Sequence, residues 1–206
     1  MDKLEQAAEV LRKGGVVIYP TETLYGLGAL AKRREAVARL AGIKGRRPDK
    51  PLPLILGSMD QLALVTEDPG EDVLAMARAF WPGPLSVLVR SNSDFSVLVR
   101  DGERLSSVRV TSHPTAARLS LLAGGPLVST SANFADGPAA ARPAELDPEL
   151  VKQVDAALLS PPLPGGGRPS TVVRVVSPGV AAVLREGAVS REELEAAGFQ
   201  VAPEAV

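Results

Sequence analysis

The stretch VVIYPTETLYGLG, residues 16–28, joins an apolar run to a proline, two threonines, a glutamate and two glycines. The run VVIY predicts a short buried strand that ends at Tyr19. Proline fixes φ, and threonine, glutamate and glycine are common where a strand ends, so the residues from Pro20 onward are typical of a turn. Whether this turn does more than redirect the chain depends on what the other strand ends carry.

Helices and strands alternate along the rest of the chain. Apolar residues at helical spacing predict helices over 4–11, 32–41, 72–80 and 114–122, and a last helix that follows a capping box of Ser190 and Glu193. Short apolar runs predict strands over 52–56, 85–89, 106–110, 126–130, 170–176 and 180–184, and breaker-rich composition predicts loops over 135–148 and 161–169. Many short strands without a strict βαβ period indicate an α/β domain with a mixed, twisted sheet.

Size and composition favour one globular domain. The chain has 206 residues, 45% of them hydrophobic and 23% charged, and its 23 basic and 24 acidic residues give a net charge of −1. These values argue against a disordered or fibrous chain and leave no global field that would draw the protein to nucleic acid or a membrane. Because no apolar run approaches the roughly 20 residues that span a bilayer, and residues 1–15 lack the pattern of a signal peptide, we expect a cytoplasmic protein.

Residue types exclude several kinds of chemistry. The chain has no cysteine and a single histidine, His113, so a thiolate nucleophile, a cysteine-based zinc site and a multi-histidine metal site are ruled out. It contains no G-x-S-x-G elbow and no Walker motif. GLGALA has the spacing of a dinucleotide fingerprint, but it does not follow its strand directly as that fingerprint requires. We interpret His113, which precedes a proline, as a turn or surface residue.

The remaining chemistry lies in small polar and basic residues near predicted strand ends, where open α/β sheets bind ligands. They are Thr21, Thr23, Lys44, Arg46, Arg109, Ser129, Ser131, Asn133, Ser170 and Arg185. Lysine and arginine suit phosphate, and hydroxyls and amides can orient a nucleotide or a small polar substrate. Simpler explanations exist for each: KGRRPDKP, residues 44–51, can be a solvated loop, the serines can satisfy turn amides, and Arg185 can pair with Glu186 at the surface.

Seven segments in order resemble one known family. YPTETLYGLG, KGRRPDKPL, FWPGPLSVLV, VRVTSHP, PLVSTSANFADG, PSTVV and LREG, between residues 19 and 187, are similar to the motifs of the YrdC/Sua5 family, the threonylcarbamoyl-AMP synthases. The resemblance implies a twisted mixed β-sheet flanked by helices around a concave basic cavity. It also implies a single YrdC-like domain over 1–206, with a C-terminal helix and tail over 188–206, and the short form without the extra domain of longer Sua5 proteins.

The resemblance further implies a nucleotidyltransferase. Family members make threonylcarbamoyl-AMP and pyrophosphate from L-threonine, bicarbonate and ATP, for the threonylcarbamoyladenosine (t6A) at position 37 of tRNA. Mg²⁺ is then expected on the ATP phosphates rather than on protein ligands, and no covalent nucleophile is required. Partner proteins that transfer the threonylcarbamoyl group to tRNA are implied too. A weak RNA contact is compatible with this reading, and no membrane is involved.

Individual residues take their expected roles from the same resemblance. The ATP site is expected to comprise Lys44, Arg46, Lys50, Ser129, Ser131, Asn133 and Arg185, and the L-threonine site Thr23, Arg109, Ser131 and Ser170. Thr21 and Glu22 are expected to hold the turn, while Gly26 and Gly28 let the backbone pass close to the ligand.

Three positions depart from the family pattern. Arg47 stands where proline often follows the K-x-R pair, Ile55 where longer relatives carry a histidine, and Arg174 where aspartate is usual. Two other functions stay open from the sequence: an RNA-binding module that uses the same cavity, and a carbamoyl-transfer enzyme related to hydrogenase maturation. Aromatic residues make up only 3% of the chain, against the first, and the absence of cysteine is against the second.

Overall fold

The opening stretch forms a β-hairpin. In the computed structural model, which describes residues 2–45, 50–92 and 94–202, β1 (Val17–Pro20) pairs antiparallel with β2 (Tyr25–Leu30). The YGLG segment is therefore a fully buried strand, and the prediction that it belongs to a turn was wrong. Gly28 lies under the Tyr19 ring, since a Cβ there would be 2.5 Å from Tyr19 Cε1. The absence of a side chain at Gly28 thus makes room for the Tyr19 ring and not for a ligand.

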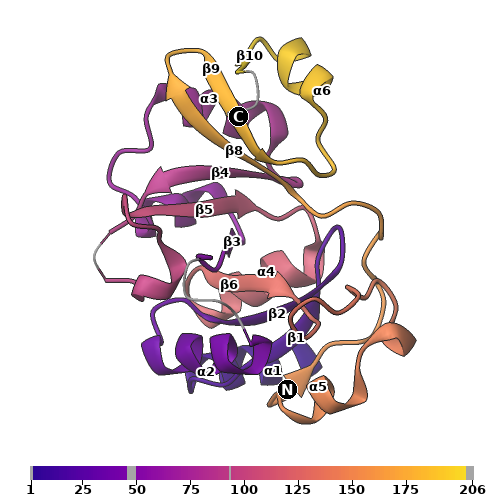
Figure 1. Ribbon diagram of the computed structural model, residues 1–206. Coiled ribbons are helices and arrows are strands. Elements are labelled where there is room, and N and C mark those ends of the chain that lie inside the picture. The colour runs from indigo at the N-terminus through magenta and orange to yellow at the C-terminus, as the bar shows by residue number, and fades with distance from the viewer. Residues whose placement is uncertain (1, 46–49, 93, 203–206) are drawn as a thin grey trace.

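Within the described ranges, ten strands make one mixed sheet in the order β10-β9-β8-β4-β5-β3-β6-β2-β1-β7, which confirms the predicted fold class. The further strands are β3 (Leu54–Leu56), β4 (Leu85–Arg90), β5 (Leu105–Val110), β6 (Leu127–Ser131), β7 (Ala156–Ala157), β8 (Thr171–Ser177), β9 (Val180–Arg185) and β10 (Gln200–Val201). β3 at the centre runs parallel to β5 and antiparallel to β6. Figure 1 shows the sheet rising from β1 and β2 at the bottom to β8 and β9 at the top.

Most helices lie close to their predicted positions, but the short helix over 148–152 was not predicted. The helices are α1 (Lys3–Arg12), α2 (Arg34–Lys44), α3 (Glu71–Phe80), α4 (Pro114–Ala123), α5 (Pro148–Lys152) and α6 (Arg191–Ala196), with 3₁₀ turns at Met59–Leu64, Val97–Val99 and Pro143–Glu145. The Ser190–Glu193 capping box before α6 is present as predicted. Helix α2 ends at Lys44, where Gly45 supplies the left-handed C-cap at φ 60°.

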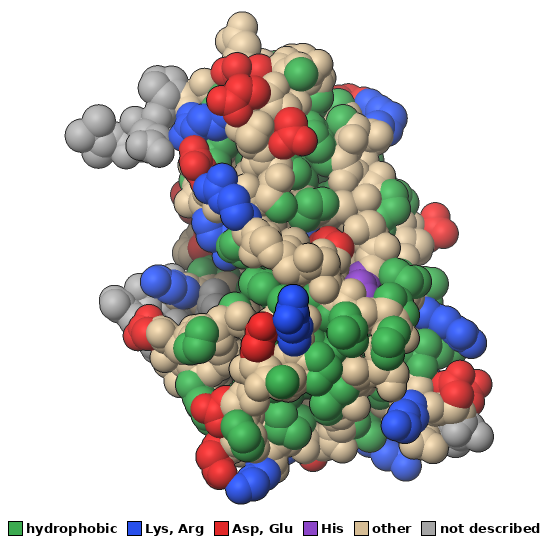
Figure 2. All heavy atoms as spheres, turned by 90° about the vertical axis from the view of Figure 1, so that its right-hand side faces the viewer, with side chains coloured by type: hydrophobic (Ala, Val, Ile, Leu, Met, Phe, Trp, Pro, Cys, Tyr) green, Lys and Arg blue, Asp and Glu red, His purple; other side chains and the backbone are tan. Residues whose placement is uncertain are grey.

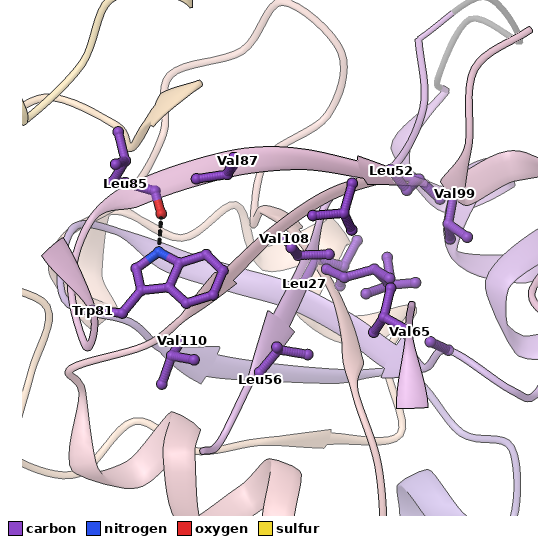
Figure 3. Close-up of a cluster of buried hydrophobic side chains, with 14 of the residues drawn as sticks. Leu27, Leu52, Leu56, Val65, Trp81, Leu85, Val87, Val99, Val108 and Val110 are labelled. Carbon is purple, nitrogen blue, oxygen red and sulfur yellow. Dashed lines mark hydrogen bonds between the residues drawn. The ribbon is translucent and has the colours of Figure 1, made fainter. Parts of the chain in front are cut away.

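Helices cover both faces of the sheet. Tyr19 of β1 and Ile55 of β3 pack with α1 and α4 in one buried cluster, while Ile18 and Leu54 pack with α2 and α3 in the other. This alternation follows from the two-residue period of a strand. Figure 3 shows part of the second cluster, where the buried Trp81 indole donates to the Leu85 carbonyl at 2.6 Å.

The face under α1 and α4 is only partly covered, and this creates the site. Leu127 of β6 is packed in the α1–α4 cluster. Ser129 and Ser131 are two and four residues further along, on the same face of β6, and they line a cavity instead. The segment 161–169, which contains no helix or strand, links β7 to β8 along one side of the molecule (Figure 1). It is tied to the β1–β2 bend by hydrogen bonds from the Gly165 and Gly166 amides.

Candidate functional site

A cavity of about 660 Å³ lies on the uncovered part of this face. That volume is typical of a pocket for a small-molecule ligand. Its lining contains three basic residues, Lys44, Arg109 and Arg185, and one acidic residue, Asp101. The described lining therefore carries an excess of positive charge, in a protein whose net charge is −1. Such a local excess suits an anionic ligand.

Three residues expected to bind L-threonine lie together in this cavity. Arg109 comes from β5, Thr23 from the β1–β2 bend and Ser170 from the residue just before β8. All three are buried, and Arg109 is only 5% exposed. The fold thus brings these three residues together in one cavity, and their contact with a ligand stays a prediction.

Lys44 joins the end of α2 to the end of β6. Its Nζ donates to the Ser131 carbonyl at 2.9 Å, to Ser131 Oγ at 3.1 Å, to the Asn133 carbonyl at 2.8 Å and to Asn133 Oδ1. Ser131 Oγ in turn donates to Asn133 Oδ1 at 2.6 Å, and the Asn133 amide nitrogen donates to the Gly137 carbonyl. The predicted lysine, serine and asparagine therefore form one hydrogen-bonded cluster. Lys44 and Ser131 line the cavity, and Asn133 supports them from outside the lining.

Arg185, expected to bind ATP, contacts Ser170, expected to bind L-threonine. Its Nη2 donates to the Ser170 carbonyl at 2.8 Å and to Ser170 Oγ at 3.0 Å, and its Nε reaches the same carbonyl at 3.2 Å. The alternative pairing with Glu186 is not what the structure shows, because Glu186 binds Arg168 and Arg191 instead. The carbonyl that precedes β8 thus fixes the Arg185 guanidinium beside the cavity.

The remaining predicted positions divide into three cases. Ser129 lines the cavity from β6. Lys50 is exposed and does not belong to the lining. Arg46 and the departing Arg47 lie outside the described residues.

The turn residues do more than sequence reasoning assigned to them. Thr21 holds the bend as expected, since its Oγ1 donates to the Leu24 carbonyl at 2.7 Å. The Glu22 side chain, in contrast, reaches across to β5: Arg109 Nε donates to Glu22 Oε1 at 2.7 Å, and Thr111 Oγ1 donates to Oε2 at 2.5 Å. Burial acts to raise the pKa of Glu22, but the Arg109 charge and the Thr111 hydroxyl outweigh it and hold that pKa below the ordinary value.

Sequence reasoning also missed one side of the cavity. Leu88, Leu105, Val172 and Leu184, from four neighbouring strands, give it an apolar surface. No local signal marks them, because each belongs to an apolar strand pattern that is equally compatible with the core. They could have been found only by knowing which sheet face the helices leave uncovered.

His113 was placed wrongly at the sequence level. It precedes α4 but is only 5% exposed, and the backbone of Pro162 and Leu163 lies close to its imidazole. Burial lowers the pKa of His113, so the neutral form is favoured. Pro114 marks the start of α4, and His113, as the residue before it, is buried and does not lie at the surface.

Two of the departures from the family pattern have structural explanations. Ile55 is fully buried in the α1–α4 cluster and does not line the cavity, so the side chain at this position packs in the core. Arg174 makes a two-pronged ion pair with Glu103, with nitrogen–oxygen distances of 3.0 and 2.6 Å. This partly exposed ion pair links β8 to the turn before β5.

The described residues contain no group of three or more His, Asp or Glu side chains that could hold a metal ion. Among the helices in the described ranges, none is both long and apolar enough to cross a membrane.

Figure 2 shows one face of the molecule, where acidic and basic side chains are interspersed among hydrophobic ones. Among the described residues on this face, the basic side chains do not form the continuous stripe typical of an RNA-binding surface.

Comparisons with known proteins agree with this geometry. A family model for Sua5, YciO and YrdC proteins, described as "Telomere recombination", matches residues 9–187. The chain is 40% identical over 173 residues to a threonylcarbamoyl-AMP synthase of Chromohalobacter salexigens, covering 83% of this chain and 91% of that protein. It is 32% identical to the threonylcarbamoyl-AMP synthase of Bacillus subtilis, covering 94% of this chain but only 56% of that protein.

A solved structure extends the likeness to three dimensions. The crystal structure of P. abyssi Sua5 complexed with L-threonine superposes with a TM-score of 0.85 at 28% identity, covering 97% of this chain and 59% of that one. The chain thus spans little more than half of two of these three relatives. The matched family model covers most of the chain, and the fold and cavity agree with it, so the chain belongs to the Sua5/YciO/YrdC family.

Proposed function

We propose that this chain is an L-threonylcarbamoyladenylate synthase, which makes threonylcarbamoyl-AMP and pyrophosphate from L-threonine, bicarbonate and ATP. One observation carries the proposal. The residues expected to bind L-threonine (Arg109, Thr23 and Ser170) and those expected to bind ATP (Lys44 and Ser131) line the same cavity. An amino acid and a nucleotide can therefore meet in one place. The names of the relatives, two of them threonylcarbamoyl-AMP synthases and one a protein bound to L-threonine, support the same reaction.

On the threonine side, Arg109 is the natural partner of the substrate carboxylate. A guanidinium binds a carboxylate through two parallel N–H···O bonds, which fix orientation as well as charge. Thr23 and Ser170 offer hydroxyls nearby for the substrate's polar groups. With the carboxylate held, the amine can be carboxylated: it attacks the carbon of bicarbonate, water leaves, and a carbamate forms.

On the nucleotide side, Lys44, Ser129, Ser131 and Arg185 would face the ATP phosphates, and Asn133 would hold Lys44 and Ser131 in place. Arg46 and Lys50, which follow α2 in the sequence, are proposed to contact the triphosphate as well. A carbamate oxygen then attacks the α-phosphorus, and the bond to the bridging oxygen breaks with release of pyrophosphate. Positive side chains and oriented hydroxyls stabilise the charge that develops, so positioning and electrostatics suffice without a covalent nucleophile.

Mg²⁺ is proposed to enter as the Mg·ATP substrate. The described lining has a single carboxylate, Asp101, and it accepts hydrogen bonds from the Glu103 and Leu105 amides at 2.9 Å. The ion would therefore be held mainly by phosphate oxygens and water, as is usual for this metal. We propose that the product passes to transferase proteins that complete the t6A modification of tRNA at position 37.

The direct test incubates the purified protein with Mg·ATP, bicarbonate and radiolabelled L-threonine. We expect pyrophosphate and a labelled adenylate, both dependent on threonine and on bicarbonate. Absence of both products with folded protein would overturn the proposal. RNA binding without any product would favour the RNA-binding module, and ATP consumption with a carbamoyl donor but no threonine would favour carbamoyl transfer.

A further inference from the structure

Glu22 is buried beside the cavity without lining it. Its side chain is 10% exposed, and the cavity lining contains Thr21 and Thr23 on either side of it but not Glu22. A carboxylate buried to this extent is costly unless it is paired and hydrogen-bonded. Its two oxygens are both used, one by Arg109 and the other by Thr111. The arrangement is therefore specific, and the proposed reaction gives Glu22 no role.

The pairing occupies only one part of the Arg109 guanidinium. The hydrogen bond comes from Nε, at 2.7 Å from Glu22 Oε1. Among the described residues, the terminal nitrogens Nη1 and Nη2 make no hydrogen bond, and Arg109 lines the cavity. A guanidinium held at Nε leaves its other edge, Nη1 and Nη2, for a planar two-oxygen anion.

Glu22 is itself held from three directions. The Thr21 hydroxyl fixes the bend by its hydrogen bond to the Leu24 carbonyl. The Gly165 amide donates to the Glu22 carbonyl at 3.3 Å, and a Cβ on Gly165 would lie 3.0 Å from that oxygen. Thr111 Oγ1 fixes the carboxylate, and it also accepts from the His113 amide at 3.2 Å. Because that hydroxyl accepts from His113, its single proton is available to Glu22.

We propose that Glu22 is a positioning residue that clamps Arg109 at Nε and thereby presents Nη1 and Nη2 to the carboxylate of the amino-acid substrate. The inference rests on the proposed function, because it concerns the same site. Two effects of Glu22 oppose each other: its negative charge weakens the attraction of Arg109 for an anion, while its hydrogen bond fixes the geometry. The inference is that geometry prevails, since an unclamped guanidinium must be ordered again each time a substrate binds.

The test is a double-mutant cycle on kcat/KM for L-threonine, with Glu22→Ala, Arg109→Ala and the double variant. Glu22→Ala is expected to lower kcat/KM about tenfold or more, mostly through KM for L-threonine, with KM for ATP unchanged. Because Glu22 acts through Arg109, adding Glu22→Ala to Arg109→Ala should cause no further loss. Additive losses, or unchanged or tighter threonine use by Glu22→Ala, would overturn the inference.

Two further comparisons separate clamping from mere structural support. Glu22→Gln keeps an acceptor for Arg109 Nε without the charge, so it should recover kcat/KM to within about threefold of the wild type. Binding of L-threoninamide, which has no carboxylate, should not differ between wild type and Glu22→Ala. A weakening of the amide equal to that of L-threonine would mean a general distortion of the site and would refute the clamp.

Two more variants serve as a control for the kinetics and as a substitute if Glu22→Ala does not fold. Glu9→Gln removes a glutamate that pairs with Arg12 on α1, away from the cavity, and should leave all kinetic values unchanged. If Glu22→Ala does not fold, Thr111→Val is tested in its place. A loss of about threefold in kcat/KM for L-threonine, with no further loss when Thr111→Val is added to Arg109→Ala, supports the clamp. An unchanged kcat/KM refutes it. A wild-type protein without activity would instead refute the proposed function, and the inference with it.

Discussion

Gly28→Ala is expected to destabilise the protein, although alanine normally suits regular structure better than glycine. The added Cβ would lie 2.5 Å from Tyr19 Cε1 and 2.6 Å from the Val128 carbonyl oxygen. Tyr19 is fully buried, and its hydroxyl donates to that same carbonyl at 3.3 Å. The ring and the β6 backbone are thus held against each other, and neither can move without loss of packing.

The size of the effect follows from two opposing contributions. Replacing glycine by alanine reduces the freedom of the unfolded chain and stabilises by about 0.4–1 kcal/mol. Inserting a methyl group into a packed region costs about 1–3 kcal/mol, and two close approaches at once place this site toward the upper end. The net loss is about 1–2 kcal/mol, which corresponds to a fall of roughly 2–8 °C in Tm for a chain of this size.

Urea unfolding at pH 7, with the thermal midpoint as a second measure, checks this prediction. The matched control is Gly42→Ala in α2, where an added Cβ meets no atom within 4 Å. That variant should be more stable than the wild type by about 0.5–1 kcal/mol. If Gly28→Ala were as stable as the wild type, the argument that Gly28 is required by the Tyr19 ring would be wrong.

Three other predictions concern the site, a helix end and pH. Lys44→Ala or Arg46→Ala should lower kcat/KM for ATP at least about tenfold, on the order of 1.4 kcal/mol, and unchanged kinetics in both variants would contradict the proposed role of these two residues. Ser190→Ala should cost about 1 kcal/mol in urea unfolding because it removes the capping box of α6. Since the folded-state pKa of Glu22 is lowered, its ion pair contributes stability above the ordinary carboxyl pKa of about 4.3 and loses it as pH falls through the lower folded value. The unfolding free energies of wild type and Glu22→Gln should therefore converge in acid, and a constant difference from pH 7 to pH 3 would contradict this reading.

Much of the fold could be predicted because local signals agreed with it. The helix at 114–122 began at its proline as predicted, and the Ser190 capping box marked the start of α6. The strand at Tyr25–Leu30 was missed because two glycines in six residues look like a turn. The Tyr19 ring from the paired strand and the Val128 carbonyl of β6, which both lie against Gly28, explain why a glycine belongs there.

The candidate site was predicted unevenly for a similar reason. Hydroxyls and cations at strand ends can be identified one segment at a time, and Thr23, Arg109 and Ser170 do meet in one cavity. Glu22 and the apolar side of the cavity could not be identified that way. Their roles depend on which strand lies opposite, as when Glu22 meets Arg109 from β5, 87 residues away in the chain. Long-range pairing of this kind leaves no local pattern in a single sequence.

The central claim is that one cavity holds the amino acid and the nucleotide together. A crystal structure of the protein with L-threonine and a non-hydrolysable ATP analogue tests it most directly. We predict the threonine carboxylate on Nη1 and Nη2 of Arg109, the triphosphate beside Lys44 and Ser131, and the threonine amine directed toward the α-phosphate. Threonine bound elsewhere, or a nucleotide outside this cavity, would contradict the account.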